Sequence, residues 1–252
     1  RDTRFKRFTF RLIYRLNWKL IVHTEFIKER LIREFAIKPD KIKVIRHGVY
    51  EVGDQELSLS QAEAKAQLGY AETDQVILFF GFLSHYKGLD LLLDAFTKMK
   101  NPERTRLIVA GRVNEEYKQP MNDLLQRYSQ ENIRFILRRI DEKELPVLFQ
   151  AAGMTVLPYR EASQSGVLFM SYAYGIPVIA PDIGGFRYDV IDGKTGFLFR
   201  CGDSADLRVK METLADPKHR QGMMSAQEIR QYARANYSWE KSGEELINFI
   251  KS

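Results

Sequence analysis

Apolar residues follow two periods along this chain, and the two periods alternate. Short apolar runs that end at turn residues predict buried strands, and stretches with apolar residues three and four positions apart predict helices. The predicted strands span residues 18–22, 43–45, 75–80, 107–110, 133–137, 155–157 and 177–180. The predicted helices span residues 1–16, 25–35, 60–69, 89–99, 121–128, 141–152, 167–174, 204–214, 220–232 and 239–250. Strands that alternate with helices predict an α/β fold, a parallel sheet with helices on both faces.

One strand–loop–helix–strand unit, residues 155–180, has the arrangement of a ligand site. Its first strand ends in a polar loop, and a helix begins after the loop at Gly166. Ligands of parallel sheets bind outside the carboxyl ends of the strands, and a helix N-terminus presents free N–H groups to an anion. The unit therefore predicts a phosphate or diphosphate site at Ser165 and Gly166, with Glu161 near the group that the phosphate carries. An ordinary βα turn without a ligand would have the same glycine pattern.

A second strand–loop–helix unit carries a lysine in its loop. The strand 75–80 is followed by Gly81, and Lys87 and Gly88 stand directly before the next helix. A lysine at such a turn supplies a point charge to a phosphate. The alternative is a lysine that is only solvated.

Composition limits the class of protein. The chain has 252 residues, 44% of them apolar, which allows one large or two small domains with a real core. The net charge of +6 suits a nucleotide diphosphate, an anionic lipid surface or a nucleic acid. No cluster of basic and aromatic residues resembles a nucleic-acid module, so we expect no nucleic-acid partner. The single cysteine, Cys201, excludes an intramolecular disulfide and fits a reducing cytoplasm.

Several other functions have no motif in the sequence. No glycine fingerprint for a nicotinamide cofactor follows a strand, and we find no P-loop, no nucleophile elbow and no His or Cys pair at metal spacing. The sequence therefore predicts neither a cofactor nor a metal. No stretch is long and apolar enough to cross a bilayer, and no secretory signal is visible. The chain begins at Arg1 rather than Met, and we expect it to be a fragment.

The first 16 residues leave two interpretations open. Apolar residues at helical spacing accompany a row of arginines, Arg4, Arg7, Arg11 and Arg15. Such a helix can lie on an anionic lipid surface, as a peripheral membrane contact at the inner face of the membrane. The alternative, which we favour, is a surface helix whose apolar face packs on a further domain.

Four motifs in these units resemble a known family. They read P-Y-x-E-A-S-Q-S-G-V from Pro158, A-x-G-x-P-V-I-A from Ala173, D-G-x-x-G-F-L from Asp192 and G-x-L-x-x-x-K-G from Gly81. Together they resemble the retaining glycosyltransferases of family four, and the resemblance covers nearly the whole chain. It implies the GT-B fold, in which two Rossmann-like domains hold the donor in the cleft between them.

The resemblance also implies a domain organisation. Residues 1–49 would be the tail of the N-terminal, acceptor-binding domain and the hinge. Residues 50–235 would form the donor-binding domain, and residues 236–252 a last helix that returns toward the first domain. His47 stands in the hinge where the family more often has asparagine, and there we expect a packing residue.

Five residues receive roles from the resemblance. Lys87 and the amides around Ser165, Gly166 and Val167 would bind the donor diphosphate. Glu161 would contact the donor sugar, although it stands one residue earlier than the family's spacing requires. We therefore expect Glu161 and Lys87 to be the catalytic residues.

The rest of the implied donor site includes two departures from the family. Gly81 would belong to the phosphate loop, and Arg139 and Ile140 would lie where the family places the nucleotide base on backbone groups. Phe82 replaces an arginine that often follows the first glycine, and Met170 replaces a second glutamate that normally binds the ribose. A thioether accepts hydrogen bonds poorly, so ribose recognition must differ here.

The expected function is transfer of a sugar from a nucleotide-diphosphate donor to a hydroxyl acceptor, with retention at the anomeric carbon. Such transfers build glycans, polysaccharides and glycolipids. The sequence leaves open the base (UDP, GDP or ADP), the sugar and the acceptor. Two alternatives remain. One is a nucleotide-sugar-binding module without turnover, motivated by Phe82 and Met170, and the other is a GT-B sugar-nucleotide epimerase.

Overall fold

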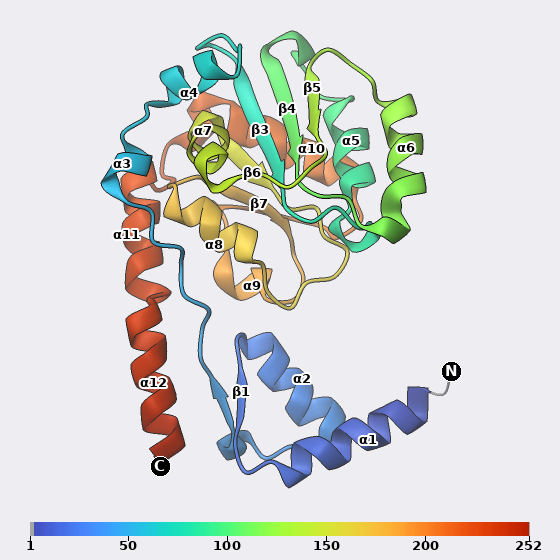
Figure 1. Ribbon diagram of the computed structural model, residues 1–252, viewed down its shortest axis with the longest axis vertical. Helices are drawn as coiled ribbons and strands as arrows, with labels where there is room; N and C mark the ends of the chain where they lie inside the picture. Colours follow the sequence, from blue (N-terminus) through green and yellow to red (C-terminus); the bar gives the residue numbers. More distant parts are fainter. Residues whose placement is uncertain (1–2, 252) are drawn as a thin grey trace.

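The computed structural model describes residues 3–251 and has a six-stranded sheet at its centre (Figure 1). The strands lie in the order β5-β4-β3-β6-β7-β8, and each neighbouring pair is parallel. Their bounds are β3 Gln75–Phe80, β4 Thr105–Ala110, β5 Ile133–Ile136, β6 Met154–Val156, β7 Val178–Pro181 and β8 Gly196–Phe199. The predicted α/β fold with a parallel sheet is confirmed.

Helices cover both faces of this sheet. They are α3 Asp54–Leu57, α4 Gln61–Gln67, α5 Leu89–Phe96, α6 Lys118–Arg127, α7 Leu145–Ala151, α8 Gly166–Ala173, α9 Phe186–Asp189, α10 Ser204–Ala215 and α11 Ala226–Asn236. Successive residues of a strand point to opposite faces, so β3 contributes to two cores. Val76 and Leu78 pack with α7, α8 and α11, while Ile77 and Phe79 pack with α5, α6 and α10.

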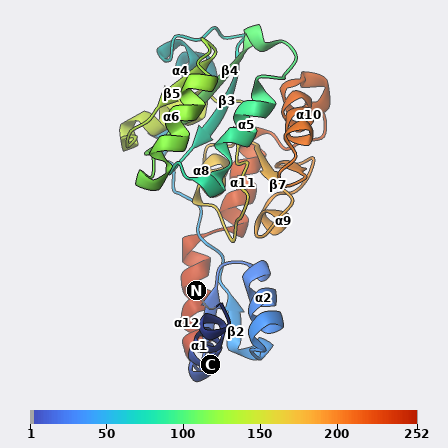
Figure 2. The ribbon, with the colours of Figure 1, turned by 90° about the vertical axis from the view of Figure 1, so that its right-hand side faces the viewer.

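Residues 3–44 form a small α/β unit with its own core (Figures 1 and 2). Its elements are α1 Thr3–Leu16, β1 Leu20–Val22, α2 Glu25–Phe35 and β2 Ile42–Val44. β1 pairs with β2 in parallel, with Leu20 opposite Ile42. Thr24 is the N-cap of α2, and its side chain accepts a hydrogen bond from the N–H of Ile27. β1, α2 and β2 together form a small βαβ unit.

The first helix carries several exposed apolar side chains, Phe8, Phe10, Leu12, Ile13 and Leu16. Within residues 3–251, no helix combines the length and the apolar character needed to cross a bilayer. Contact of α1 with a lipid surface stays a prediction.

A linker of residues 45–53 joins the small unit to the large sheet, and α12 (Trp239–Lys251) runs back beside it (Figure 2). Hydrogen bonds hold the C-terminal end of the chain against the linker and the small unit. The N–H of Val49 donates to the carbonyl of Tyr237 over 2.6 Å, and the hydroxyl of Ser242 donates to the carbonyl of Arg46 over 2.7 Å. At the far end of α12, the Lys19 ammonium donates to the carbonyl of Phe249. The last helix therefore contacts both the linker and the small unit.

Gly48 lies close against Trp239, the first residue of α12. A Cβ at this position would lie 2.2 Å from the Trp239 ring, so a larger residue does not fit without a shift. The ring of His47 stacks on that of Phe169, with 5.6 Å between centroids and 8° between planes. His47 is therefore a packing residue at the start of the linker.

Several predicted element bounds were wrong, and the strand β8 was not predicted. The helix predicted over 220–232 begins only at Ala226, because Ser225 and Glu228 form a capping box there. Gly196 falls outside the predicted strands, yet it is the first residue of β8. Its φ is +154°, and a Cβ there would lie 1.8 Å from the Val178 carbonyl oxygen, so the strand pairing itself requires glycine.

Candidate functional site

Two loops leave the carboxyl edge of the sheet next to each other, because β3 and β6 are neighbouring strands. Residues 81–88 lead from β3 to α5, and residues 157–165 lead from β6 to α8. Gly81 has a φ of +121°, and a Cβ there would lie 3.3 Å from Cγ2 of Val167. The first loop therefore touches the beginning of α8.

The N-terminus of α8 has unused hydrogen-bond donors. Ser165 is buried, and its side-chain oxygen accepts from the N–H of Leu168 over 3.4 Å and lies 3.3 Å from the Tyr159 hydroxyl. Within the part of the chain that the structure describes, no acceptor binds the backbone N–H of Gly166 or Val167. The positive end of the helix dipole strengthens the attraction of these two donors for an anion.

Lys87 is a half-buried cation held by aromatic faces. Its Nζ lies 3.8 Å from the centroid of the Tyr159 ring and 5.0 Å from that of Tyr86. Among residues 3–251 it forms no ion pair with a carboxylate. Burial lowers the pKa of Lys87 to about 8. Because the hydroxyl of Tyr159 contacts Ser165, this one ring connects the lysine to the start of α8.

An ion pair joins the two loops. The guanidinium of Arg160 donates to both carboxylate oxygens of Asp90, over 2.9 and 2.6 Å, and also to the carbonyl of His85 over 3.0 Å. The backbone N–H of Arg160 donates to the carbonyl of Tyr86 over 2.8 Å. The residues bound by Arg160 stand on both sides of Lys87 in the sequence. The bonds therefore hold the loop that carries Lys87 against the loop that carries Glu161.

Glu161 is exposed, and among the described residues its carboxylate has no hydrogen-bond or ion-pair partner. The backbone beside it is fixed by the glycine pair after β7. A Cβ at Gly184 would lie 1.7 Å from the Ala162 carbonyl oxygen, and the N–H of Gly185 donates to that oxygen over 3.4 Å. The Glu161 carboxylate is therefore free to bind a ligand, while the backbone next to it packs against Gly184 and Gly185.

The two departures from the family motif differ in their surroundings. Phe82 is exposed in the loop after β3. Met170 lies on α8 and packs against the core beside that helix, where a carboxylate would need a partner.

The predicted base-contacting residues follow β5. Arg138 pairs with Glu144 over 2.6 Å and also donates to the carbonyl of Arg139 over 3.1 Å. The side chain of Arg139 is exposed, and Ile140 packs partly against the core. No hydrogen bond or ion pair within residues 3–251 connects these residues to the two loops. The structure thus brings together Gly81, Lys87, Glu161, Ser165, Gly166 and Val167, and it leaves Arg139 and Ile140 at the end of a different strand.

Three residues of this site were not predicted from the sequence. Tyr159 and Arg160 lie inside the motif around Glu161. Their contacts with Lys87 and Asp90 depend on β3 and β6 being neighbours in the sheet, which is the one signal that could have suggested them. Tyr50 lies on the linker, and its hydroxyl is 3.5 Å from the position that a Cβ would take on Gly166. No pattern in the sequence connected Tyr50 with α8.

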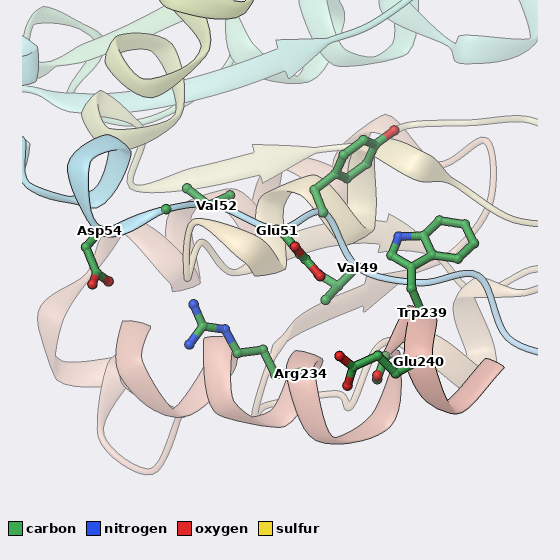
Figure 3. A pocket seen from close by; sticks show the side chains of 10 residues that line it. Val49, Glu51, Val52, Asp54, Arg234, Trp239 and Glu240 are labelled. Carbon is green, nitrogen blue, oxygen red and sulfur yellow. The ribbon is translucent and has the colours of Figure 1, made fainter. Parts of the chain in front are cut away.

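A pocket of 520 Å³ lies between the linker and the junction of α11 with α12 (Figure 3). Its charged lining residues are Glu51, Asp54, Arg234 and Glu240, and Figure 3 shows the Arg234 side chain extending from α11 toward the linker. Within residues 3–251, no group of three or more His, Cys, Asp or Glu side chains is arranged to hold a metal ion. Tyr50 also lines this pocket, so it lies at the boundary between the pocket and the start of α8.

Comparison with protein families matches residues 60–235 to "Glycosyl transferases group 1". The matched segment contains all six strands of the large sheet and both loops of the candidate site.

The chain is also similar to characterised proteins. It is 27% identical over 238 residues to the D-inositol 3-phosphate glycosyltransferase of Corynebacterium aurimucosum, covering 91% of this chain and 55% of that protein. The protein of the same name from Thermobifida fusca is 28% identical over 242 residues, covering 91% of this chain and 54% of that protein. The chain therefore spans about half the length of the curated relatives it matches.

Solved structures share its fold. Sucrose-phosphate synthase from Thermosynechococcus elongatus superposes with a TM-score of 0.82 at 23% identity, covering 100% of this chain and 62% of that one. The Anabaena protein HepE, solved in complex with UDP and glucose, gives a TM-score of 0.80 at 20% identity, covering 97% of this chain and 66% of that one.

Proposed function

The chain belongs to the group 1 glycosyl transferase family, and we propose that it transfers a sugar from a nucleotide-diphosphate donor to a hydroxyl acceptor. Its parallel sheet with helices on both faces is the Rossmann-like fold of GT-B glycosyltransferases. The observation that carries the proposal is the convergence of unused donors at the carboxyl edge of the sheet. Lys87 lies on one side of the Tyr159 ring, and the start of α8, with the free N–H groups of Gly166 and Val167, lies beside the hydroxyl of that ring.

In this proposal the leaving diphosphate binds between Lys87 and the N-terminus of α8. Stabilising the charge that develops on a leaving group is a large part of catalysis in such reactions. The charge of Lys87 and the two backbone donors would supply this stabilisation, and Arg160 with Asp90 would hold the lysine loop in place. Glu161, whose carboxylate has no partner within the described chain, would bind hydroxyls of the donor sugar.

We propose that transfer proceeds with retention, as in the glycosyltransferases of family four. The acceptor oxygen would attack the anomeric carbon on the face from which the diphosphate leaves. A phosphate oxygen would take the proton of the acceptor hydroxyl, so that no protein nucleophile is required. Bond formation to the acceptor and cleavage of the bond to the diphosphate then occur on one face.

The names of the relatives support transfer rather than epimerisation, since those proteins are named as glycosyltransferases. A cytoplasmic location with contact at the inner face of a membrane is part of the proposal. It rests on the single exposed cysteine and on the exposed apolar side chains of α1.

Turnover of nucleotide sugars tests the proposed function. UDP-, GDP- and ADP-linked sugars would be incubated with the protein, and release of nucleoside diphosphate would be measured in the presence of candidate hydroxyl acceptors. Proton NMR of the product would report the anomeric configuration. We expect one base to be preferred and the configuration of the donor to be kept. An inverted product would refute retention, and binding of a donor without release would favour a binding module without turnover.

A further inference from the structure

The linker contributes one side chain to the start of α8. Tyr50 is 44% exposed, and its hydroxyl lies 3.5 Å from the Cβ position of Gly166. Leaving aside the residues adjoining Gly166 and the backbone of α8 itself, it is the one atom among the described residues within 4 Å of that position. The open side of Gly166 therefore faces the Tyr50 hydroxyl.

This hydroxyl is an unused donor. Among residues 3–251 it has no hydrogen-bond partner, and the backbone N–H groups of Gly166 and Val167 have none either. The phenol O–H near Gly166 and the backbone N–H groups of Gly166 and Val167 are three donors without an acceptor among the described residues. An anion with several oxygens satisfies such an arrangement.

The backbone of the linker holds Tyr50 in place. On the residue before it, the N–H of Val49 donates to the Tyr237 carbonyl, and Gly48 packs closely against Trp239. The ring of Tyr50 also lies 6.5 Å from that of His47, between centroids. The hydroxyl is thus presented to α8 by a linker that is fixed to the first turn of α12.

We propose that Tyr50 is a donor-binding residue whose hydroxyl donates to a phosphate oxygen bound at the N-terminus of α8. This rests on the proposed function, because it requires the diphosphate at that helix. It supplies a neutral contact in a site where Phe82 replaces the arginine of the family motif. Since Tyr50 belongs to the linker, an occupied donor site also restrains the linker and the small unit attached to it.

Tyr50→Phe removes only the oxygen and tests the contact. Calorimetric titration would give the dissociation constants of nucleoside diphosphate and of inorganic pyrophosphate for the wild-type protein and the variant. Loss of a hydrogen bond to a charged group predicts affinity about tenfold weaker for both ligands. The melting temperature without ligand should not change, because the hydroxyl has no partner within the described chain.

Tyr188→Phe is the matched control, since the Tyr188 hydroxyl donates to Glu29 over 3.1 Å and not to the site. It should bind both ligands as the wild-type protein does. Equal affinities of Tyr50→Phe and the wild-type protein for both ligands would overturn the proposal. So would weaker nucleoside diphosphate binding with unchanged pyrophosphate binding, because Tyr50 would then contact the base or ribose. If the wild-type protein bound neither ligand, the proposed function would fail, and the role of Tyr50 with it.

Discussion

The ammonium of Lys87 lies 3.8 Å from the centroid of the Tyr159 ring. The aromatic face attracts the cation without neutralising it, as a carboxylate would. The lysine is thus positioned, partly desolvated and still able to pair with an anion. Tyr159 also contacts Ser165, so the Lys87 ammonium and the start of α8 both contact this one aromatic side chain.

Replacing Lys87 should weaken nucleotide binding and little else. Lys87→Met keeps most of the apolar stem and removes the charge. We expect affinity for nucleoside diphosphate to fall by about 1.5–3 kcal/mol, the magnitude of a charged hydrogen bond. Titration calorimetry measures this, with Lys98→Met as control because Lys98 pairs with Asp94 on the surface of α5. Unchanged affinity in Lys87→Met would exclude Lys87 from the site.

Binding of the diphosphate should depend on pH in a window set by Lys87. Burial lowers the pKa of Lys87 from 10.5 to about 8 in the unliganded protein. Above pH 8 the ligand must therefore bind with uptake of a proton, and affinity should fall by up to tenfold per pH unit. Titrations over a range of about pH 7.5 to 9.5 would detect the slope, because this range brackets the lowered pKa. Lys87→Met should lack the slope, and the same slope in both proteins would assign it to another group.

The stability of the unliganded protein should show the opposite trend. Between pH 8 and 10.5 the unfolded chain binds more protons at Lys87 than the folded protein does, because the folded pKa is the lower one. The contribution of Lys87 to the free energy of unfolding therefore increases with pH through this window. Denaturant unfolding of wild-type protein and Lys87→Met at about pH 7.5, below that window, and at about pH 9.5, within it, isolates the contribution as a difference. A difference that is constant with pH would contradict the lowered pKa.

Arg160 and Asp90 should act as a positioning pair for Lys87. Both side chains are about one-third or more exposed, so the pair itself should contribute only about 1 kcal/mol to stability. Arg160→Met should nevertheless weaken diphosphate binding several-fold, because the lysine loop loses its bonds to the neighbouring loop. A double-mutant cycle with Asp90→Asn measures the coupling in binding energy. Strictly additive effects would show that the pair does not act on Lys87.

Glu161→Gln should separate catalysis from nucleotide binding. The two side chains have the same shape, and Glu161 has no partner within the described chain whose loss would disturb the fold. We expect kcat to fall by at least about tenfold while affinity for the free nucleoside diphosphate stays within about twofold. Glu131→Gln, at an exposed loop position, serves as control. A collapse of nucleotide affinity would make Glu161 a nucleotide ligand or a structural residue.

Gly48→Ala should destabilise the linker packing. The added Cβ would lie 2.2 Å from the Trp239 ring, which forces a shift with an expected loss of about 1–3 kcal/mol. Thermal melting measures the loss, and Trp239→Ala in the same chain should relieve the clash. Gly243→Ala on α12 is the matched control, because nothing lies within 4 Å of its Cβ position. Equal melting temperatures of the Gly48 and Gly243 variants would contradict the close packing.

Local patterns predicted much of the fold because they depend on neighbours in sequence. The apolar run of β3 and the amphipathic pattern of α2 gave the observed bounds, Gln75–Phe80 and Glu25–Phe35. Gly196 was not predicted as part of a strand, because its role depends on the carbonyl of Val178 on the neighbouring strand. The helix α11 was predicted to begin too early, since polar residues precede it and the capping box at Ser225 fixes its start.

The site was predicted only as far as its motifs reach. Lys87, Glu161 and Ser165 lie in loops whose glycines and polarity are visible in the sequence. The contacts that position them are tertiary, and neither Tyr159 beside Lys87 nor Tyr50 beside Gly166 has a local signature. The sequence therefore predicted which loop residues meet at the carboxyl edge, and the neighbouring elements that hold them became visible only in the structure.

The central claim is a diphosphate site between Lys87 and the start of α8, and thermal melting with nucleoside diphosphates tests it most directly. A ligand at a hundred times its dissociation constant stabilises a protein by about 2.7 kcal/mol. We predict that UDP, GDP or ADP selectively raises the melting temperature of the wild-type protein, and that Lys87→Met reduces the shift at the same ligand concentration. No shift with any of the three nucleotides, or an equal shift in Lys87→Met, would contradict the account.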